Sequence, residues 1–342
     1  MRLSVLDQSV AVTGRSEDAS IRETLSLARH CEALGYERFW VSEHHSHPSI
    51  VGSAPEVLMA AIAATTQRIR VGSAGVMLPH YSALKVAEQF RVLEALAPGR
   101  IDLGVGRAPG SDGRTAQLLN PHAHRAADHF PVQVRELQAW VSGTDLPAGH
   151  PGHGIVARPM GPTAPTLWML GSSNYGAQLA AHYGLPYAFA HFITDGQGAE
   201  EALTMYRDLY RPSPAHPEPQ AALCVWALAA DTEEQAWHHF SSRERWKIDR
   251  NQGALGPLLS PSEVTLRSYS ADEQAGAEKL RSTALVGCAA QVADKLRALA
   301  DALAVQELVV ITWTHDPEAR RRSYELLARE FCKTTSKMKK AD

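Results

Sequence analysis

A glutamate and three histidines stand close together in the segment EHHSHP, residues 43–48. An apolar stretch typical of a β-strand comes directly before it, so the segment should lie at the end of a strand. Imidazole and carboxylate groups could ligate a metal ion here, or a histidine with a pKa near neutrality could pass a proton beside a bound cofactor. The third interpretation is a polar loop of hydrogen-bonded histidines.

The spacing of these residues disfavours the metal interpretation. Glu43, His44, His45 and His47 are too crowded at a strand end for all of them to face one ion. The sequence also has no H-E-x-x-H motif and no framework of cysteines and histidines elsewhere. We therefore expect no metal, and the other two interpretations stay open.

A second candidate is the segment GSSNYGA, residues 171–177, which precedes a helical pattern. Ser172 and Ser173, between small residues, would let backbone N–H and hydroxyl groups approach an anion at the positive end of the helix dipole. A phosphate would fit there. The alternative is an ordinary helix start, with a serine or asparagine as the N-cap.

A third candidate is Arg107, which ends an apolar strand pattern and is surrounded by residues too small to bury it. Arginine binds phosphate through paired hydrogen bonds, so Arg107 could hold an anionic group. A salt bridge at the rim of the fold is the other interpretation.

The elements that must position these residues alternate between strand and helix. Eight short apolar runs are typical of buried strands: 3–6, 37–42, 69–77, 100–106, 166–170, 186–190, 221–229 and 307–312. Helical patterns separate them, and two of these have clear starts, a capping box at Asp231 with Glu234 and an N-cap at Asp316.

This alternation predicts an α/β protein whose parallel sheet is covered by helices. The count of eight strands favours a (β/α)8 TIM barrel, with insertions near 143–165 and 250–285 where the pattern is weak. In such barrels function gathers at the carboxyl ends of the strands, where all three candidate segments lie. We expect one domain over 1–332 and a basic tail over 333–342.

Composition excludes several classes of partner. The 342 residues include 34 basic and 37 acidic ones, a net charge of -3, so no strong field would gather nucleic acid or an anionic membrane. No apolar run is long enough to span a bilayer. The four cysteines are scattered without a C-x-x-C pair, as in a reducing compartment, and we expect a cytoplasmic protein.

The chain resembles the bacterial-luciferase-like flavin-dependent monooxygenases from about residue 3 to 210, with a looser similarity over 286–327. The similarity is carried by the segments LGYERFWVSEHH, PEVLMAAIAATTQRIRVGSAGVMLPHYSALKVAEQF, LEALAPGRIDLGVGRAPGSD and GSSNYGAQLAAHYGLPYAFA. The resemblance implies a barrel that binds reduced FMN at its mouth, where oxygen forms a flavin C4a-peroxide that attacks a substrate.

The resemblance also implies roles for individual residues. His44 matches the catalytic histidine near the flavin ring, and Ala74-Gly75 matches a non-proline cis peptide beneath that ring. Arg107 matches the arginine that pairs with the flavin phosphate, and Ser172 and Ser173 match the residues around it. Ser172 departs from the luciferase α chain, which has an acidic residue there.

The expected reaction combines reduced FMN and O2 with an unidentified small organic substrate. No dinucleotide-binding G-x-G-x-x-G fingerprint occurs, so a separate flavin reductase should supply the reduced FMN. Two alternatives stay open: hydride transfer with the deazaflavin F420, and a non-catalytic flavin-binding protein. We expect a homodimer.

Overall fold

The computed structural model describes residues 1–338 and has an α/β architecture. One nine-stranded sheet has the strand order β6-β5-β4-β3-β2-β1-β9-β7-β8, and β6 also pairs with β7. The register pairs that define the sheet are parallel, for example between β3 and β4 and between β1 and β9. The β6–β7 pairing closes eight of these strands into a ring that leaves out only β8, which confirms the predicted (β/α)8 barrel.

The strands are β1 (Arg2–Asp7), β2 (Arg38–Val41), β3 (Arg70–Met77), β4 (Ile101–Gly106), β5 (Thr166–Gly171), β6 (Tyr187–Phe189), β7 (Ala221–Ala230), β8 (Leu285–Cys288) and β9 (Glu307–Ile311). The helices in the first half of the chain are α1 (Glu17–Leu34), α2 (Pro55–Thr65), η1 (Leu78–His80), α3 (Ala83–Leu96), α4 (Gly113–Leu119), α5 (Ala123–Ser142) and α6 (Asn174–Tyr183). The remaining helices are α7 (His191–Thr194), α8 (Ala199–Asp208), α9 (Glu233–Asn251), α10 (Pro261–Thr265), α11 (Ala271–Thr283), α12 (Ala289–Ala302) and α13 (Pro317–Met338).

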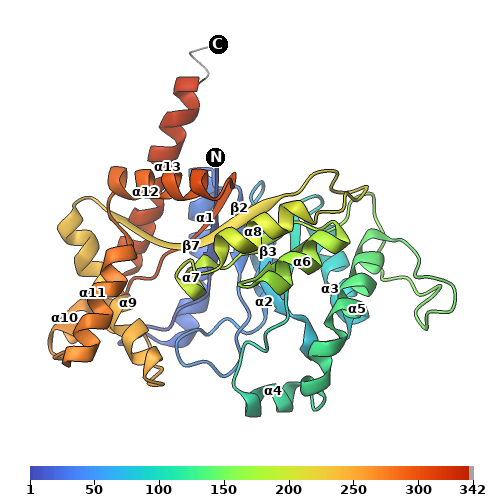
Figure 1. The fold of residues 1–342 in the computed structure, drawn as a ribbon, viewed down its shortest axis with the longest axis horizontal. Coiled ribbons are helices and arrows are strands. Elements are labelled where there is room, and N and C mark those ends of the chain that lie inside the picture. The colour runs from blue at the N-terminus through green and yellow to red at the C-terminus, as the bar shows by residue number, and fades with distance from the viewer. Residues whose placement is uncertain (339–342) are drawn as a thin grey trace. The chain divides into compact units, whose positions relative to one another are not determined.

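The chain divides into two compact units. Unit 1 comprises Met1–Glu37, His47–Val51 and the chain from Leu223 onward, and unit 2 comprises Arg38–Ser46 and Gly52–Ala222. Within unit 1, α10 and α11 pack on α9, and within unit 2, α6 packs beside α8 and α3 beside α5 (Figure 1). The expectation of one domain over 1–332 stays a prediction.

The core of unit 2 contains a carboxylate that is shared among three neighbouring strands. Asp102 on β4 is fully buried, and its Oδ2 accepts hydrogen bonds from Arg38 Nη1 at 2.8 Å and Trp40 Nε1 at 3.0 Å, both on β2. Its Oδ1 accepts from Arg70 Nη2 on β3 at 2.6 Å. The three donors compensate the loss of hydration that burial imposes on the carboxylate.

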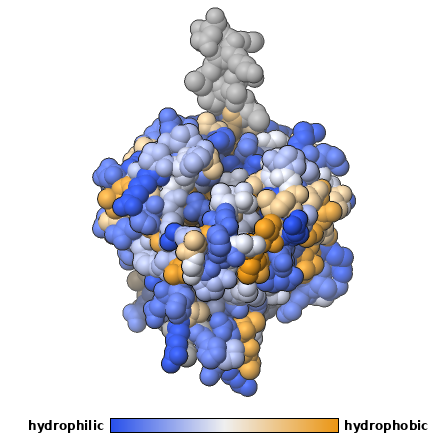
Figure 2. Space-filling model, turned by 90° about the vertical axis from the view of Figure 1, so that its right-hand side faces the viewer, coloured by the Kyte–Doolittle hydropathy of each residue, from blue (hydrophilic) through white to orange (hydrophobic). Residues whose placement is uncertain are grey.

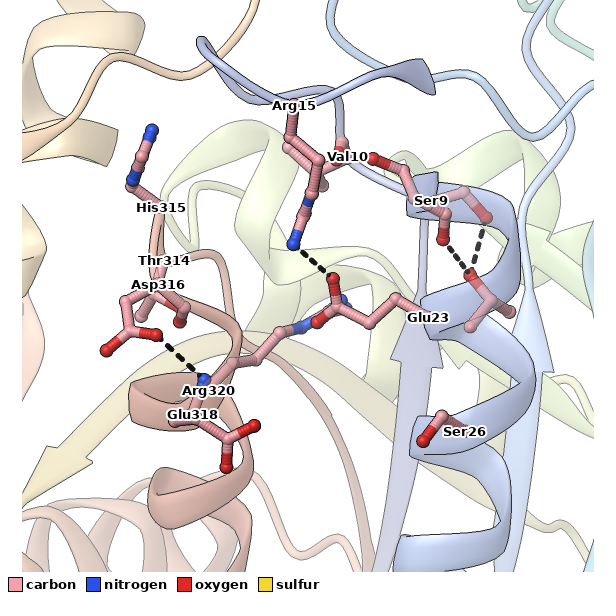
Figure 3. Close-up of polar contacts among 12 residues, drawn as sticks. Ser9, Val10, Arg15, Glu23, Ser26, Thr314, His315, Asp316, Glu318 and Arg320 are labelled. Atoms are coloured by element: carbon pink, nitrogen blue, oxygen red, sulfur yellow. Dashed lines mark hydrogen bonds and ion pairs between the residues drawn. The ribbon is translucent and has the colours of Figure 1, made fainter. Parts of the chain in front are cut away.

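Unit 1 contains a chain of charged side chains, most of them buried (Figure 3). Glu23 on α1 pairs with Arg15 at 2.7 Å and lies 3.9 Å from Arg320 Nη1 on α13. Arg320 also donates to Asp7 at the end of β1. Burial would raise the pKa of Asp7, but Arg320 and the Thr24 hydroxyl together lower it below its ordinary 3.8.

This pKa shift predicts how acid affects unit 1. Below about pH 4 the unfolded chain takes up a proton at Asp7 while the folded chain does not, so the free energy of unfolding should fall as the pH drops. One such proton changes the free energy by at most about 1.4 kcal/mol per pH unit. Between about pH 5 and pH 3, the free energy of unfolding measured in urea should therefore change less with pH for Asp7→Asn than for the unchanged chain. Equal slopes would contradict the assignment.

One expectation about unit 1 is corrected by the structure. The predicted capping box at Asp231 and Glu234 is wrong, because α9 begins one residue later and its N-cap is Thr232, whose hydroxyl accepts from Gln235 N. Asp231 binds Arg322 instead. The weak segment 250–285 contains α10 and α11, and the short strand β8 that follows it is parallel to β7.

The surface mixes hydrophilic and apolar residues. Figure 2 shows one face on which blue hydrophilic residues predominate and orange apolar residues form small patches. Exposed apolar side chains include Val57, Leu96, Leu118, Ile155 and Leu266. Among residues 1–338, no helix combines the length and apolar character needed to cross a bilayer.

Candidate active site

The carboxylate of Glu43 organizes the segment after β2 in unit 2. The residue is buried, and its Oε1 accepts a hydrogen bond from the Tyr81 hydroxyl at 2.7 Å. The same oxygen lies 2.6 Å from His45 Nε2, while Oε2 accepts from the backbone N–H of Met77 at 3.1 Å. Burial and the Glu43 charge raise the pKa of Tyr81, so the phenol stays protonated as a donor. Glu43 thus links His45 to the end of β3.

His44 lies between Glu43 and His45 and is half-buried. Its backbone N–H donates to the carbonyl of Gly52 at 3.0 Å, which holds the chain as it leaves β2. His45 is thus anchored by the Glu43 carboxylate, and His44 is the half-buried histidine next to it.

The loop after β4, residues 107–110, packs against this segment. Gly110 has a φ of +59°, and its carbonyl accepts from His45 N at 3.1 Å. A Cβ at Gly110 would stand 3.0 Å from the Glu43 carbonyl oxygen, so the close approach requires glycine. His80 Nε2 lies 2.7 Å from the carbonyl oxygen of Pro109. The ends of β2, β3 and β4 therefore converge, as the barrel predicts.

Strand β3 departs from regular pairing beside these residues. Its register with β4 shifts between Ser73 and Val76, and the Ala74–Gly75 peptide bond is cis, the geometry that the family resemblance implies. The Ser73 hydroxyl donates to the Gly104 carbonyl at 2.9 Å and accepts from Gly104 N at 3.1 Å. The hydroxyl thus replaces backbone pairing that the register shift interrupts.

Arg107 carries a charge without a carboxylate partner. The side chain is exposed, and among the described residues it makes no salt bridge. Its guanidinium lies over the ring of Tyr175, with Cζ 4.0 Å from the ring centroid. The rim salt bridge considered from the sequence is therefore absent from residues 1–338, and the cation is held beside the first turn of α6 by an aromatic face.

The start of α6 has serine hydroxyls that the helix itself does not use. Ser173 is the N-cap and has extended backbone angles, but its side chain makes no capping hydrogen bond. Gly176 packs close to β5 and β6, since a Cβ built there would be in van der Waals contact with Tyr187 at 3.4 Å and with Gly171 Cα at 3.5 Å. The first N–H groups of α6 and the Arg107 cation thus both lie near Tyr175, and both favour an anion.

Sequence reasoning missed three residues of this arrangement. Tyr81 and His80 were not singled out, because neither belongs to a recognizable motif, and Tyr175 was read only as part of a helix start. The one available signal was the aromatic residue within GSSNYGA, two positions after the N-cap. His47 belongs to unit 1, where its Nδ1 accepts from the backbone N–H groups of Ser49 and Ile50.

Within the described part of the chain, no group of three or more histidine, cysteine, aspartate or glutamate side chains is arranged to hold a metal ion. The oxygens of Glu43 are occupied by Tyr81, His45 and Met77.

Comparison with known proteins adds independent information. A family model described as luciferase-like monooxygenase matches residues 1–306. The uncharacterized protein YwcH of Bacillus subtilis (strain 168) is 45% identical over 331 residues, which cover 96% of this chain and 98% of YwcH. N-acetyl-S-alkylcysteine monooxygenase of the same organism is 36% identical, covering 96% and 97% of the two chains.

Solved structures share the architecture. Apo-MsnO8 is 36% identical and superimposes with a TM-score of 0.87, covering 96% of this chain and 98% of its own. The oxygenating constituent of a 3,6-diketocamphane monooxygenase from Pseudomonas putida, in complex with FMN, has a TM-score of 0.69 at 18% identity, covering 96% and 97%. An F420-dependent secondary alcohol dehydrogenase has a TM-score of 0.66 at 13% identity, covering 95% and 97%. The last two similarities concern the fold alone.

Proposed function

The chain belongs to the family of luciferase-like monooxygenases, and from that premise we propose that it is a monooxygenase that uses reduced FMN and O2. The observation that carries the proposal is the unpaired Arg107 cation stacked on Tyr175 at the start of α6. A cation, free helix N–H groups and unused serine hydroxyls together match the doubly charged phosphate at one end of FMN.

The residues present fit the phosphate and the ring of FMN. Arg107, with Ser172 and Ser173, would bind the phosphate, and the small, half-buried Ala74 on β3 leaves room for a planar ring. When bound, reduced FMN supplies two electrons for splitting O2, so that one oxygen atom enters the substrate and the other leaves as water. In this scheme the His44 imidazole holds or passes a proton, and Glu43 holds its neighbours in place.

The family relationship favours FMN over the deazaflavin alternative. The F420-dependent dehydrogenase resembles this chain at 13% identity, which concerns the fold alone. Several monooxygenases are far more similar in sequence, such as the relative at 36% identity. A protein that only carries flavin would need no histidine at the mouth. The proposed catalysis therefore accounts for His44, whereas a carrier role does not.

Oxygen chemistry tests the proposal. Reduced FMN, the protein and ¹⁸O2 should be mixed with a panel of small substrates, beginning with N-acetyl-S-alkylcysteines because one relative is named for them. We expect substrate-dependent oxygen uptake and one labelled atom in the product. Hydride transfer from reduced F420 without oxygen uptake would support the dehydrogenase instead, and flavin binding without turnover of any substrate would support the carrier.

Replacing Arg107 with alanine should weaken FMN binding by about tenfold or more, because a charge-assisted contact to phosphate is lost. Riboflavin, which lacks the phosphate, should be affected much less. Calorimetric titration with both ligands measures the difference. Arg211→Ala, at another exposed arginine of unit 2, serves as the control and should leave both affinities unchanged. Equal losses for FMN and riboflavin in Arg107→Ala would count against the phosphate site.

Three further features belong to this proposal. We propose that a separate reductase supplies the reduced FMN, that the protein is a homodimer and that it acts in the cytoplasm. Activity with enzymatically recycled FMN, compared with NADH or NADPH alone, tests the first. Sedimentation equilibrium tests the second, and cell fractionation the third.

A further inference from the structure

We propose that Tyr175 is a positioning residue that holds Arg107 in place for an anionic ligand, and that its aromatic face, not its hydroxyl, performs this role. The inference rests on the proposed function, since the ligand is the phosphate of FMN. It adds a residue that neither the sequence motifs nor the family match assigns.

The geometry is that of a close cation–π contact. Arg107 Cζ lies 4.0 Å from the centroid of the Tyr175 ring, which is the shortest such distance among the described residues. The other arginine–aromatic pairs range from 4.3 to 5.9 Å. A planar guanidinium over a ring keeps its edge free, so its N–H groups can still donate to phosphate oxygens.

The surroundings indicate that the stack is needed. Arg107 is exposed and follows β4 directly, and among residues 1–338 no carboxylate restrains it. An unrestrained arginine would lose considerable side-chain freedom when it binds a ligand. Tyr175 instead restrains the guanidinium beforehand, which lowers this loss.

The backbone of α6 fixes the ring in turn. Tyr175 is the second residue of the helix, after the N-cap Ser173, and its neighbour Gly176 is buried against Tyr187. Close packing at Gly176 seats the first turn on the sheet, so the Tyr175 ring is carried by a rigid element. The stack therefore brings the cation to the helix end whose free N–H groups also favour an anion.

The hydroxyl of Tyr175 takes no part in this arrangement. Among the described residues it makes no hydrogen bond. Phenylalanine would preserve the aromatic face, whereas leucine would preserve bulk and apolar character without the π system. These two substitutions separate the proposed role from simple packing.

The test is calorimetric titration of the full-length protein with FMN and with riboflavin. Tyr175→Phe should bind FMN within about twofold of the unchanged chain, while Tyr175→Leu should bind it about threefold to tenfold more weakly. Riboflavin affinity should be the same in all three proteins. Riboflavin also serves as the folding control, because a variant that binds it normally has an intact ring site.

The double variant Arg107→Ala with Tyr175→Leu completes the design. If Tyr175 acts through Arg107, the leucine substitution should have no further effect on FMN affinity once Arg107 is gone. Additive losses, equal losses in Tyr175→Phe and Tyr175→Leu, or tighter FMN binding by Tyr175→Leu would each overturn the inference. Failure of the proposed function looks different: Arg107→Ala alone would then not distinguish FMN from riboflavin.

Discussion

Replacing His44 with alanine is expected to slow product formation by about 100-fold to 10,000-fold, while reduced FMN still binds with nearly unchanged affinity. The reason is that a group that holds or passes a proton contributes to the reaction and little to binding. His44 is half-buried and is adjacent to Glu43, whose carboxylate binds His45 instead. Single-turnover assays with reduced FMN, oxygen and substrate measure the rate, and equilibrium titration measures the affinity.

The matched control for this variant is His47→Ala, three positions along the same segment. His47 Nδ1 accepts two backbone N–H groups, from Ser49 at 3.1 Å and Ile50 at 3.2 Å, so its loss should lower the thermal stability. Turnover per folded molecule of His47→Ala should stay unchanged. If His44→Ala shows the same pattern as His47→Ala, His44 has a structural role. Stoichiometric zinc or iron, with activity abolished by a chelator, would support the metal interpretation.

Replacing Asp102 with alanine is expected to lower the free energy of unfolding by about 3–5 kcal/mol, because it leaves the buried Arg38 cation without its carboxylate partner. Arg38 is itself buried, and Arg70 donates to Asp102 through both Nε at 3.0 Å and Nη2 at 2.6 Å. Trp40 Nε1 would also lose its acceptor. Urea unfolding followed by circular dichroism measures the change.

A surface carboxylate provides the comparison for Asp102. Asp294 pairs with Arg297 at 3.0 Å, but its side chain is 78% exposed, so Asp294→Ala should change stability by less than about 0.5 kcal/mol. Asp102→Asn should lower the free energy of unfolding by less than Asp102→Ala and by more than Asp294→Ala, since the amide oxygen can still accept one hydrogen bond. Comparable stabilities for Asp102→Ala and Asp294→Ala would mean that the three donors find other partners.

The barrel could be predicted because its signals are local. Each of the eight predicted strands is a short apolar run, and the structure places a strand at each of them. Asp316 was also predicted correctly as a cap, since its Oδ1 accepts from Glu318 N at 3.0 Å. The short strand β8 was missed, because four residues beside β7 carry too little pattern to be distinguished from a loop.

The candidate site could be predicted only in part. Chain order identified the strand ends, and the barrel rule predicted that the segment after β2 lies at the same end as Arg107. The structure then joins Glu43 to Met77 and Gly110 there. The contacts themselves depend on side-chain direction, which spacing does not give. Nothing in the sequence indicated that Glu43 would bind Tyr81, or that Arg107 would lie over Tyr175. Similarly, Asp231 and Thr232 are both good N-caps, and only the tertiary pairing of Asp231 with Arg322 decides between them.

A crystal structure of the protein with FMN tests the central claim most directly. We predict the phosphate within hydrogen-bonding distance of the Arg107 guanidinium and the Ser172–Ser173 backbone, with Arg107 still stacked on Tyr175. The flavin ring should lie beside Ala74–Gly75. A phosphate bound elsewhere, with Arg107 turned toward solvent, would contradict the account.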